Sequence, residues 1–301
     1  MPAPRALRLA LLALLAAGLA WLAAVLLARP APAHPFFAAE RPDVQVIAHR
    51  GGARLRPEET LEAFDHAARL GADILDLDAR ATADGAIVCL HDASVDRTTD
   101  GSGLVAALTL ADLRRLDAGY RWTQDEGRTF PFRGKGLQVP TLEEVLKRHA
   151  RSRMVIEMKV RTPDFARSLC SLARDAGMAQ RVLVASFDHA TLDAFRQACP
   201  EVATSMSQRE AQVFWLLARL RLTAAASPDA VALQVPERFA GVEVLTPALM
   251  TAARGRNLRV HAWTVNDDET MRRLIALGVD GMMTDRPDRL LALSGMVRLS
   301  R

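Results

Sequence analysis

Short apolar runs alternate with segments of helical periodicity along most of this 301-residue chain. The run at 182–186 is uninterrupted and rich in valine, which is typical of a strand that is buried on both faces. The segment at 60–70 instead places Leu61, Phe64 and Ala68 on one face, which is typical of an amphipathic helix. The same alternation continues nearly to the end of the chain and predicts repeated strand-helix units.

Eight strands and the helices between them can be assigned from this pattern. The predicted strands lie at 44–49, from 74 onward, and at 154–160, 182–186, 203–207, 232–235, 259–265 and 280–284, and the predicted helices at 60–70, 142–149, 164–176, 190–198, 210–220, 247–256 and 268–277. Eight strands with helices between them predict a (β/α)8 TIM-like barrel, whose functional site lies at the carboxyl ends of the strands. A doubly wound open sheet is the alternative, although no glycine-rich phosphate loop of the usual form follows the first strand.

Residues 93–140 interrupt the alternation after the second strand. They contain one predicted helix at 110–116 and an irregular segment rich in glycine, arginine and aromatic residues. Such a long excursion inside a compact domain is usually functional. We therefore predict an insertion that lies over the site, within a barrel domain that spans 43–295.

The N-terminus has the pattern of a membrane segment. Arg5 and Arg8 precede an apolar run at 9–28, about long enough as a helix to cross a bilayer core. The predicted organisation is a cytoplasmic segment at 1–8, a transmembrane anchor at 9–28 and a linker rich in proline and alanine at 29–42. Positive charge ahead of a first span tends to stay in the cytoplasm, so we expect the barrel on the extracytoplasmic side. Small residues at 31–33 make a cleaved signal peptide the alternative, although its apolar region would be unusually long.

Composition narrows the class of protein further. Half of the residues are hydrophobic, a quarter are charged, and the net charge is +4. Because the positive charge is spread along the chain without a basic block, nucleic-acid binding is not predicted. Cys89, Cys170 and Cys199 lie far apart without the spacing of a zinc site, and we predict that all three are small buried hydrophobic residues.

Two acids lie inside the strand that begins at residue 74. Asp76 and Asp78 are two positions apart, so both carboxylates leave the same face of the strand. A fold tolerates two like charges on one face when a cation lies between them. Asp84-Gly85 predicts a hairpin turn, and counting outward from it places His91 opposite Asp78. Two carboxylates and an imidazole at one level predict a candidate metal and acid-base site.

Ionisable residues also end the neighbouring strands. His49 and Arg50 follow the first strand, Glu157 and Lys159 end the third, and Trp263 and Asn266 end the seventh. A charge at the end of a buried strand must be paired or bound to something. Carboxylates suit a hard divalent cation, basic side chains suit an anion such as phosphate, and imidazoles suit proton transfer.

Each of these residues alone has a simpler structural explanation. A histidine at a strand end is more often structural than catalytic, and Glu157 with Lys159 could form a plain salt bridge. Arg50 and Trp263 could simply cover apolar surface. The joint pattern outweighs these explanations. The other histidines of the barrel region lack acidic partners in the pattern and are predicted to be structural: His66, His149, His189 and His261.

Eleven motifs in order resemble the glycerophosphodiester phosphodiesterase family. They are HRGG at 49–52, PEET at 57–60, DLD at 76–78, TADG at 82–85, HD at 91–92, TTDGSG at 98–103, PTLEEVL at 140–146, IEMK at 156–159, SF at 186–187, WTVN at 263–266 and GVDGMMTDRPD at 278–288. Any one of them is weak evidence, but eleven in sequence are highly specific. The resemblance covers about residues 44–290.

The resemblance implies an activity, which is the hydrolysis of glycerophosphodiesters to glycerol 3-phosphate and an alcohol on a barrel of this kind. His49 and His91 match the two catalytic histidines of the family. The ligands of its divalent cation, Ca²⁺ or Mg²⁺, match Asp76, Asp78 and Glu157. The residues that hold the phosphate match Arg50 and Lys159, and a tryptophan that lines the pocket matches Trp263. The insertion at 93–140 falls where the family carries one, which implies a role in substrate specificity.

Two residues depart from the pattern of the family. Asp76 stands where the family usually has glutamate, so the cation must lie closer to the strand or take an additional water. Glu59 stands where the family usually has asparagine. Its added charge is either exposed to solvent and harmless, or it disturbs the turn that supports His49.

Two other functions fit the same residues. One is a non-catalytic barrel that binds phosphate esters. The other is a lysophospholipase D-type hydrolase, which the anchor and the aromatic residues of the insertion make conceivable: Tyr120, Trp122, Phe130 and Phe132. The sequence assigns neither the roles of the two histidines nor the nucleophile, which is water or the glycerol hydroxyl next to the phosphate.

Overall fold

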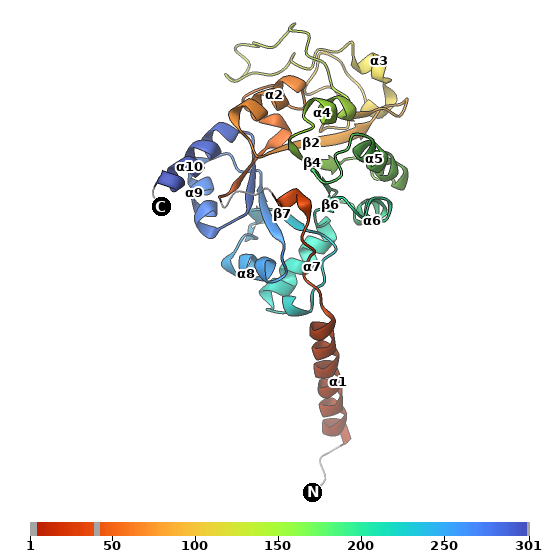
Figure 1. Ribbon diagram of the computed structural model, residues 1–301, viewed down its shortest axis with the longest axis vertical. Coiled ribbons are helices and arrows are strands. Elements are labelled where there is room, and N and C mark those ends of the chain that lie inside the picture. The colour runs from red at the N-terminus through yellow and green to blue at the C-terminus, as the bar shows by residue number, and fades with distance from the viewer. Residues whose placement is uncertain (1–4, 39–42, 300–301) are drawn as a thin grey trace.

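Parallel strands and helices alternate around a nearly closed barrel in the computed structural model, which describes residues 5–38 and 43–299 (Figure 1). In this described part of the chain, the barrel strands follow the order β6-β5-β4-β2-β1-β11-β10-β7. A bridge between Ser205 and Ala232 joins the two ends of that series. The strands are β1 Gln45–Ala48, β2 Ile74–Ala81, β4 Arg153–Met158, β5 Val182–Ala185, β6 Ala203–Thr204, β7 Ala232–Pro236, β10 Arg259–Trp263 and β11 Gly281–Thr284. The predicted TIM-like barrel is confirmed, and the open sheet is disfavoured.

Helices cover the outside of the barrel, and most of them begin at a capping side chain. They are α2 Leu61–Leu70, α4 Leu142–Arg148, α5 Pro163–Asp175, α6 His189–Ala198, α7 Gln208–Arg219, α8 Pro247–Gly255, α9 Asp268–Leu277 and α10 Pro287–Leu299. Thr60, Asp188 and Asp267 each accept a hydrogen bond from the backbone N–H three residues later. These bonds satisfy N–H groups that a helix start leaves without partners.

The N-terminal segment that precedes β1 closes the inside of the barrel. Phe36, in the short 3-10 turn Pro35–Phe37, is fully buried in the interior cluster with Ile47 and Val155. The backbone N–H of Ala31 donates to the carbonyl of Arg256 at 2.8 Å. Part of the predicted linker at 29–42 therefore packs against the barrel, whereas its residues 39–42 lie outside the described residues.

The helix α1 (Arg5–Leu27) projects away from the barrel (Figure 1). Among residues 5–38 and 43–299, we find no helix that is both long and apolar enough to cross a membrane. The transmembrane anchor at 9–28 is therefore not confirmed and stays a prediction.

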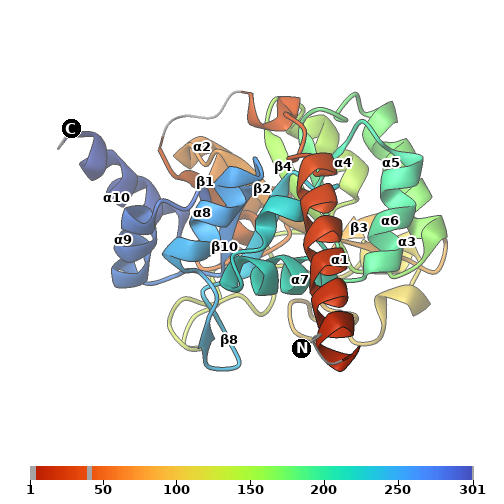
Figure 2. The same cartoon turned by 90° about the horizontal axis from the view of Figure 1, so that it is seen from below.

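Two small hairpins extend from the barrel strands. Strand β3 (Ile87–Cys89) pairs antiparallel with β2, as predicted, but the predicted register was wrong by one residue. The backbone N–H of Leu90, and not His91, faces Asp78, because it donates to the Asp78 carbonyl at 2.9 Å. The turn is one residue longer than a two-residue loop, since Thr82 and Ala86 close it with backbone and side-chain hydrogen bonds. The second hairpin, β8 (Arg238–Phe239) and β9 (Val242–Glu243), follows β7 (Figure 2).

The insertion at 93–140 has a small apolar core of its own. Val95, Val105 and Leu113 are buried together with Val88 of the β3 strand. Its helix α3 (Leu110–Leu113) is shorter than the predicted helix at 110–116. The insertion is thus anchored on the hairpin that follows β2.

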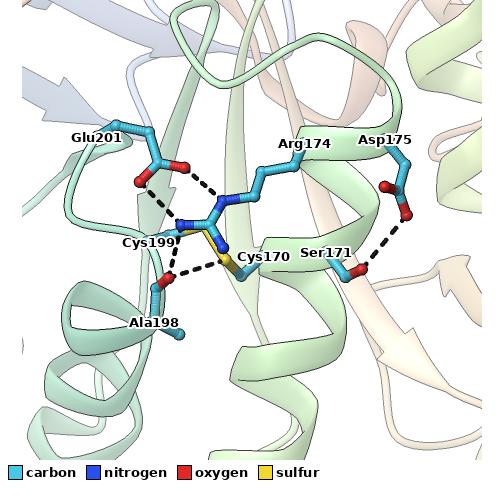
Figure 3. Close-up of a disulfide and its surroundings, with 7 residues drawn as sticks. All are labelled: Cys170, Ser171, Arg174, Asp175, Ala198, Cys199 and Glu201. Atoms are coloured by element: carbon cyan, nitrogen blue, oxygen red, sulfur yellow. Dashed lines mark hydrogen bonds and ion pairs between the residues drawn. A yellow bond between two sulfur atoms is a disulfide. The ribbon is translucent and has the colours of Figure 1, made fainter.

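A disulfide joins Cys170 of α5 to Cys199 at the end of α6, with their Cα atoms 5.8 Å apart (Figure 3). Beside it, Arg174 bonds the carboxylate of Glu201 and the carbonyl of Ala198. The prediction that all three cysteines are plain hydrophobic residues was wrong for this pair. The two helices pack side by side, which a separation of 29 residues does not reveal. Cys89 is free and buried.

Replacing Cys170 and Cys199 by serine is expected to lower the free energy of unfolding by about 3 to 4 kcal/mol, because the closed loop restricts the unfolded chain. Chemical denaturation of the oxidised wild type and the double variant measures this loss. The matched control is Cys89→Ser in the oxidised protein, which leaves the disulfide intact. Equal stability of the wild type with and without a reducing agent would contradict the expectation.

Candidate active site

A cavity of about 640 Å³ opens at the carboxyl ends of the barrel strands. It brings together all eight residues that the sequence singled out for function: His49, Arg50, Asp76, Asp78, His91, Glu157, Lys159 and Trp263. The histidines predicted to be structural do not line it: His66, His149, His189 and His261. Among the described residues, none of the insertion at 93–140 lines it either, so a role of the insertion in specificity stays a prediction.

The turn after β1 positions His49 and Arg50. Arg50 adopts a positive φ of 51°, and Gly51 follows with a φ of 79°. A Cβ atom at Gly51 would lie 2.7 Å from the Cβ of Ala63 on α2. Only glycine permits this close approach, which folds the turn onto the helix. The tight turn therefore holds the imidazole and the guanidinium at the mouth of the barrel.

Asp285 orients the imidazole of His49. Its Oδ1 lies 2.6 Å from His49 Nδ1, and its Oδ2 accepts a hydrogen bond from Asn266 Nδ2 at 2.7 Å. Burial tends to lower the pKa of His49, but the hydrogen bond to Asp285 and the charges of Asp76 and Asp285 outweigh it and raise that pKa. With Nδ1 held by Asp285, Nε2 is the ring nitrogen left for the cavity.

His91 also has a carboxylate partner, but its pKa is shifted in the opposite direction from that of His49. Its Nδ1 lies 2.6 Å from Asp92 Oδ1, and Arg97 of the insertion donates to the other oxygen of Asp92 at 2.6 Å. Burial lowers the pKa of His91, and the opposing effects of Asp78 and Asp92 do not restore it. Two imidazoles with different proton affinities thus line one cavity.

Three buried or half-buried carboxylates crowd the floor of the cavity. Asp76 and Asp78 are 7% and 4% exposed, and Glu157 lies opposite Asp78 in the register of β2 and β4. Burial and the charges of Asp78 and Glu157 raise the pKa of Asp76 to about 7, against the opposing effect of His49. Such crowding is unfavourable for carboxylates that lack a cation.

Lys159 and Arg50 counter part of this negative charge. The Nζ atom of Lys159 lies 3.1 Å from Asp78 Oδ1 and 2.8 Å from Glu157 Oε1. Arg50 Nε lies 3.4 Å from Asp78 Oδ2, and its Nη1 donates to Glu58 at 2.9 Å. Burial raises the pKa of Asp78, but Lys159, His91 and Arg50 outweigh it and lower that pKa. The cavity therefore presents fixed positive groups as well as acids.

The oxygen donors of this cluster fit a hard divalent cation in their chemistry. Of the three carboxylates, Asp78 and Glu157 form ion pairs with Lys159, whereas Asp76 forms none with the residues that the structure describes. Asp76 would therefore gain most from a bound cation. Within residues 5–38 and 43–299, however, no three His, Cys, Asp or Glu side chains stand grouped as a metal site. Lys159 instead bridges Asp78 and Glu157, so binding of a cation would require its ammonium group to give way.

Glu59 is buried beside β2 and supports the strand that carries Asp78. It is 5% exposed with a φ of 58°, a backbone conformation that asparagine adopts more readily. Its Oε1 accepts a hydrogen bond from the backbone N–H of Asp78 at 3.0 Å, and its own N–H donates to the carbonyl of Arg50. Burial and the charges of Asp78 and Asp76 raise its pKa well above the usual value. The suggestion that Glu59 is exposed and harmless is wrong, because it braces the strand that carries Asp78.

The residues that orient the two histidines were not assigned from the sequence. Asp285 follows β11 within the TDRPD stretch, and Asp92 directly follows His91. The signal available for Asp285 was an acid just after the last barrel strand, at the same edge as His49. Asp92 is next to His91 in the sequence, but this adjacency alone does not show that its carboxylate contacts the imidazole.

Comparisons with known proteins agree with this geometry. A model of the glycerophosphoryl diester phosphodiesterase family matches residues 49–289. The chain is 32% identical to a glycerophosphodiester phosphodiesterase of Caldanaerobacter subterraneus subsp. tengcongensis, over 82% of this chain and 96% of that protein. A glycerophosphodiester phosphodiesterase structure from Agrobacterium tumefaciens is 27% identical and superimposes with a TM-score of 0.67, over 83% of this chain and 99% of that one.

A third comparison concerns a protein whose structure contains a ligand. The phosphodiesterase of Oleispira antarctica, solved in complex with the product sn-glycerol-3-phosphate, has the same fold, with a TM-score of 0.65 and 24% identity. The match covers 82% of this chain and 95% of that one. The family match spans most of the chain, and the relatives are covered nearly in full. The chain therefore belongs to the glycerophosphoryl diester phosphodiesterase family.

Proposed function

We propose that this enzyme hydrolyses glycerophosphodiesters to glycerol 3-phosphate and an alcohol by acid-base catalysis with His49 and His91, assisted by a divalent cation. The observation that carries the proposal is the pair of imidazoles in one cavity, each with a carboxylate on Nδ1 and with pKa values shifted in opposite directions. Titratable groups whose environments separate their pKa values are the usual pattern of an acid and a base.

Asp76, Asp78 and Glu157 would hold the cation. Enzymes of this family generally use a divalent metal, and Ca²⁺ and Mg²⁺ both prefer oxygen ligands. When bound, such a cation offsets the negative charge of the phosphodiester and stabilises the charge that develops on its oxygens.

Arg50 and Lys159 bind and orient the phosphate. Both are largely buried. Arg50 is held 3.4 Å from Asp78 before the substrate arrives, whereas Lys159 would turn from Asp78 and Glu157 to the phosphate when a cation binds there. Fixed donors cost little reorganisation when charge gathers on the phosphate oxygens. Trp263, at the end of β10, provides an apolar wall for the carbon atoms of the substrate.

The two histidines then divide the proton transfers. The lowered pKa of His91 keeps its Nε2 free to remove a proton from the nucleophile, which is water or the neighbouring glycerol hydroxyl. The raised pKa of His49 keeps it protonated, so that Nε2 can donate to the departing alkoxide. If the glycerol hydroxyl attacks first, water opens the cyclic phosphate in a second step.

The test is the release of glycerol 3-phosphate from glycerophosphocholine by the full-length chain with Ca²⁺ or Mg²⁺. We expect turnover that a chelator abolishes and that the added cation restores. Binding of glycerophosphocholine without turnover under any of these conditions would instead favour a non-catalytic phosphate-ester-binding barrel.

Asp285→Asn is expected to lower kcat and to shift the alkaline limb of the pH-rate profile to lower pH. Asparagine cannot supply the negative charge that raises the pKa of His49, so the imidazolium is lost at a lower pH. The pH profile of kcat/KM measures the shift. Asp267→Asn, at the exposed cap of α9, is the matched control and should leave the profile in place. An unshifted alkaline limb in Asp285→Asn would show that Asp285 does not act through His49.

We also propose that the barrel lies outside the cytoplasm, tethered to the membrane by the N-terminal segment. The support is the disulfide between Cys170 and Cys199, since such bonds persist in oxidising compartments. The arginines that precede the apolar run favour the same orientation. In intact cells with a permeable outer layer, added protease should degrade the barrel. Protection of the barrel until the cells are lysed would contradict this location.

A further inference from the structure

The active-site cavity continues beyond the residues that the proposed reaction uses. Its polar end holds the histidines, acids and bases described above. The remainder is walled by one face of α7, by the β8–β9 hairpin and by the start of α8: Ala211, Trp215, Leu216, Phe239, Val242 and Leu249. A cavity of about 640 Å³ lies within the range of about 300–1,000 Å³ that holds drug-sized ligands. A glycerol phosphate bound at the polar end would leave this remainder unfilled.

The walls of this extension expose apolar side chains that the fold itself does not require. Leu216 is 52% exposed, Phe239 is 59% exposed and Val242 is 46% exposed, and all three line the cavity. Phe187, 44% exposed, lines it as well and packs edge to face on Trp263 with ring centroids 5.9 Å apart. Single exposed apolar residues are ordinary, but several gathered around one cavity indicate an apolar ligand.

The charges of the cavity lie at its other end. Among the described residues, every charged side chain that lines it belongs to the polar cluster around Asp78, and the extension adds only uncharged groups such as Gln208 and Gln212. A cationic headgroup such as choline would find no carboxylate in the extension. A hydrocarbon chain would bury apolar surface against Trp215, Leu216 and Val242 without leaving any charge unpaired.

We propose that the preferred substrate is a glycerophosphodiester that carries one long acyl chain on its glycerol, and that this chain lies in the extension between α7 and the β8–β9 hairpin. This inference rests on the proposed function, because the phosphate must sit at His49 and His91 for the chain to reach the extension. The acyl chain adds binding free energy away from the reacting atoms.

The aromatic residues of the insertion are not the acyl site. Trp122 donates its indole N–H to the carbonyl of Ala53 at 2.9 Å, and Arg133 stacks on the rings of Tyr120 and Phe130 at 4.0 and 3.9 Å. These rings pack within the insertion and against the segment at Ala53 and Arg56, and they do not line the cavity. The acyl chain of a lysolipid is therefore expected to bind at α7 and not at the aromatic residues of the insertion.

The reaction on such a substrate is the same hydrolysis. The oxygen of water forms a new bond to phosphorus, directly or through the cyclic phosphate, and the bond from phosphorus to the headgroup oxygen breaks. The proton taken from the nucleophile is balanced by the proton given to the departing alkoxide. With lysophosphatidylcholine the products are choline and lysophosphatidic acid, and the acyl ester is unchanged.

Choline release from two substrates that differ only in the acyl chain tests the proposal. We expect the full-length chain to turn over palmitoyl-lysophosphatidylcholine, kept below its micelle concentration, with a kcat/KM at least about 10-fold above that for glycerophosphocholine. Leu216→Gln and Val242→Asn should each lower the ratio of the two kcat/KM values by about 10-fold or more, because each places a polar group against the chain. Both side chains are about half exposed, so neither change should unfold the protein.

Val213→Gln is the matched control, because Val213 is 53% exposed on the same helix but does not line the cavity. It should leave the substrate ratio unchanged. Turnover of glycerophosphocholine with no preference for the lysolipid would overturn this inference and leave the proposed function standing. A preference seen only above the micelle concentration and insensitive to Leu216→Gln would overturn it in favour of docking on a lipid surface. Turnover of neither substrate would overturn both proposals.

Discussion

Replacing His91 or His49 by alanine is expected to lower kcat for glycerophosphocholine by about 10²- to 10⁴-fold. Each variant removes one of the two proton transfers, while the groups that bind the phosphate remain in place. Both imidazoles line the cavity at the ends of strands and are not part of the apolar core, so the fold should survive their loss. Steady-state kinetics and a thermal melt of each variant measure these two expectations separately.

His66→Ala is the matched control, because it removes an imidazole from α2 that does not line the cavity. It should retain the activity of the wild type. If either His49→Ala or His91→Ala kept full activity, the two-histidine mechanism would be untenable.

Removal of the divalent cation is expected to lower the stability of the folded protein at neutral and alkaline pH. Asp76 should be the main cause of this loss. Burial and neighbouring charges raise the pKa of Asp76 to about 7 without a cation, above its ordinary value. The folded apo protein therefore binds a proton at Asp76 more tightly than the unfolded chain does. The contribution of Asp76 to stability should therefore be greatest at low pH and should fall as the pH rises from about 4 to 7.

Asp76→Asn should remove this dependence and stabilise the chelated protein at about pH 8 by roughly 2 to 4 kcal/mol. Added Ca²⁺ or Mg²⁺ should raise the melting temperature of the wild type and have little effect on the variant, because a ligand that binds only the folded state stabilises it. Asp229→Asn, on an exposed loop, is the control. A melting temperature of the wild type that does not respond to either cation would contradict the assignment of Asp76 as a ligand.

The barrel could be predicted because its pattern is local. Apolar runs such as 182–186 read as buried strands, and Thr60 and Asp267 lie at the helix starts that their residue types favour. The pairing of Cys170 with Cys199 could not be predicted, since it depends on how two helices pack. The register of the β2–β3 hairpin was missed by one residue because Thr82 and Ala86 close a longer turn than Asp84-Gly85 suggests.

The site could be predicted for a different reason. Residues that end parallel strands meet at one edge of a barrel, so His49, Asp76 and Glu157 had to lie near one another once the strands were assigned. Their partners could not be inferred in the same way, because Asp285 is 236 residues from His49 and the contact depends on closure of the barrel. The apolar extension of the cavity could not be predicted from the sequence either, because the sequence of α7 has the ordinary pattern of an amphipathic helix.

The pH dependence of kcat/KM for glycerophosphocholine tests most directly whether both imidazoles act on one phosphodiester. His91 must be neutral, so the rate should rise with pH through its lowered pKa. His49 must be protonated, so the rate should fall again above its raised pKa. The account predicts a bell-shaped profile over the neutral pH range, with one limb on each side of the ordinary pKa of histidine. A rate that changes in only one direction across this range would contradict it.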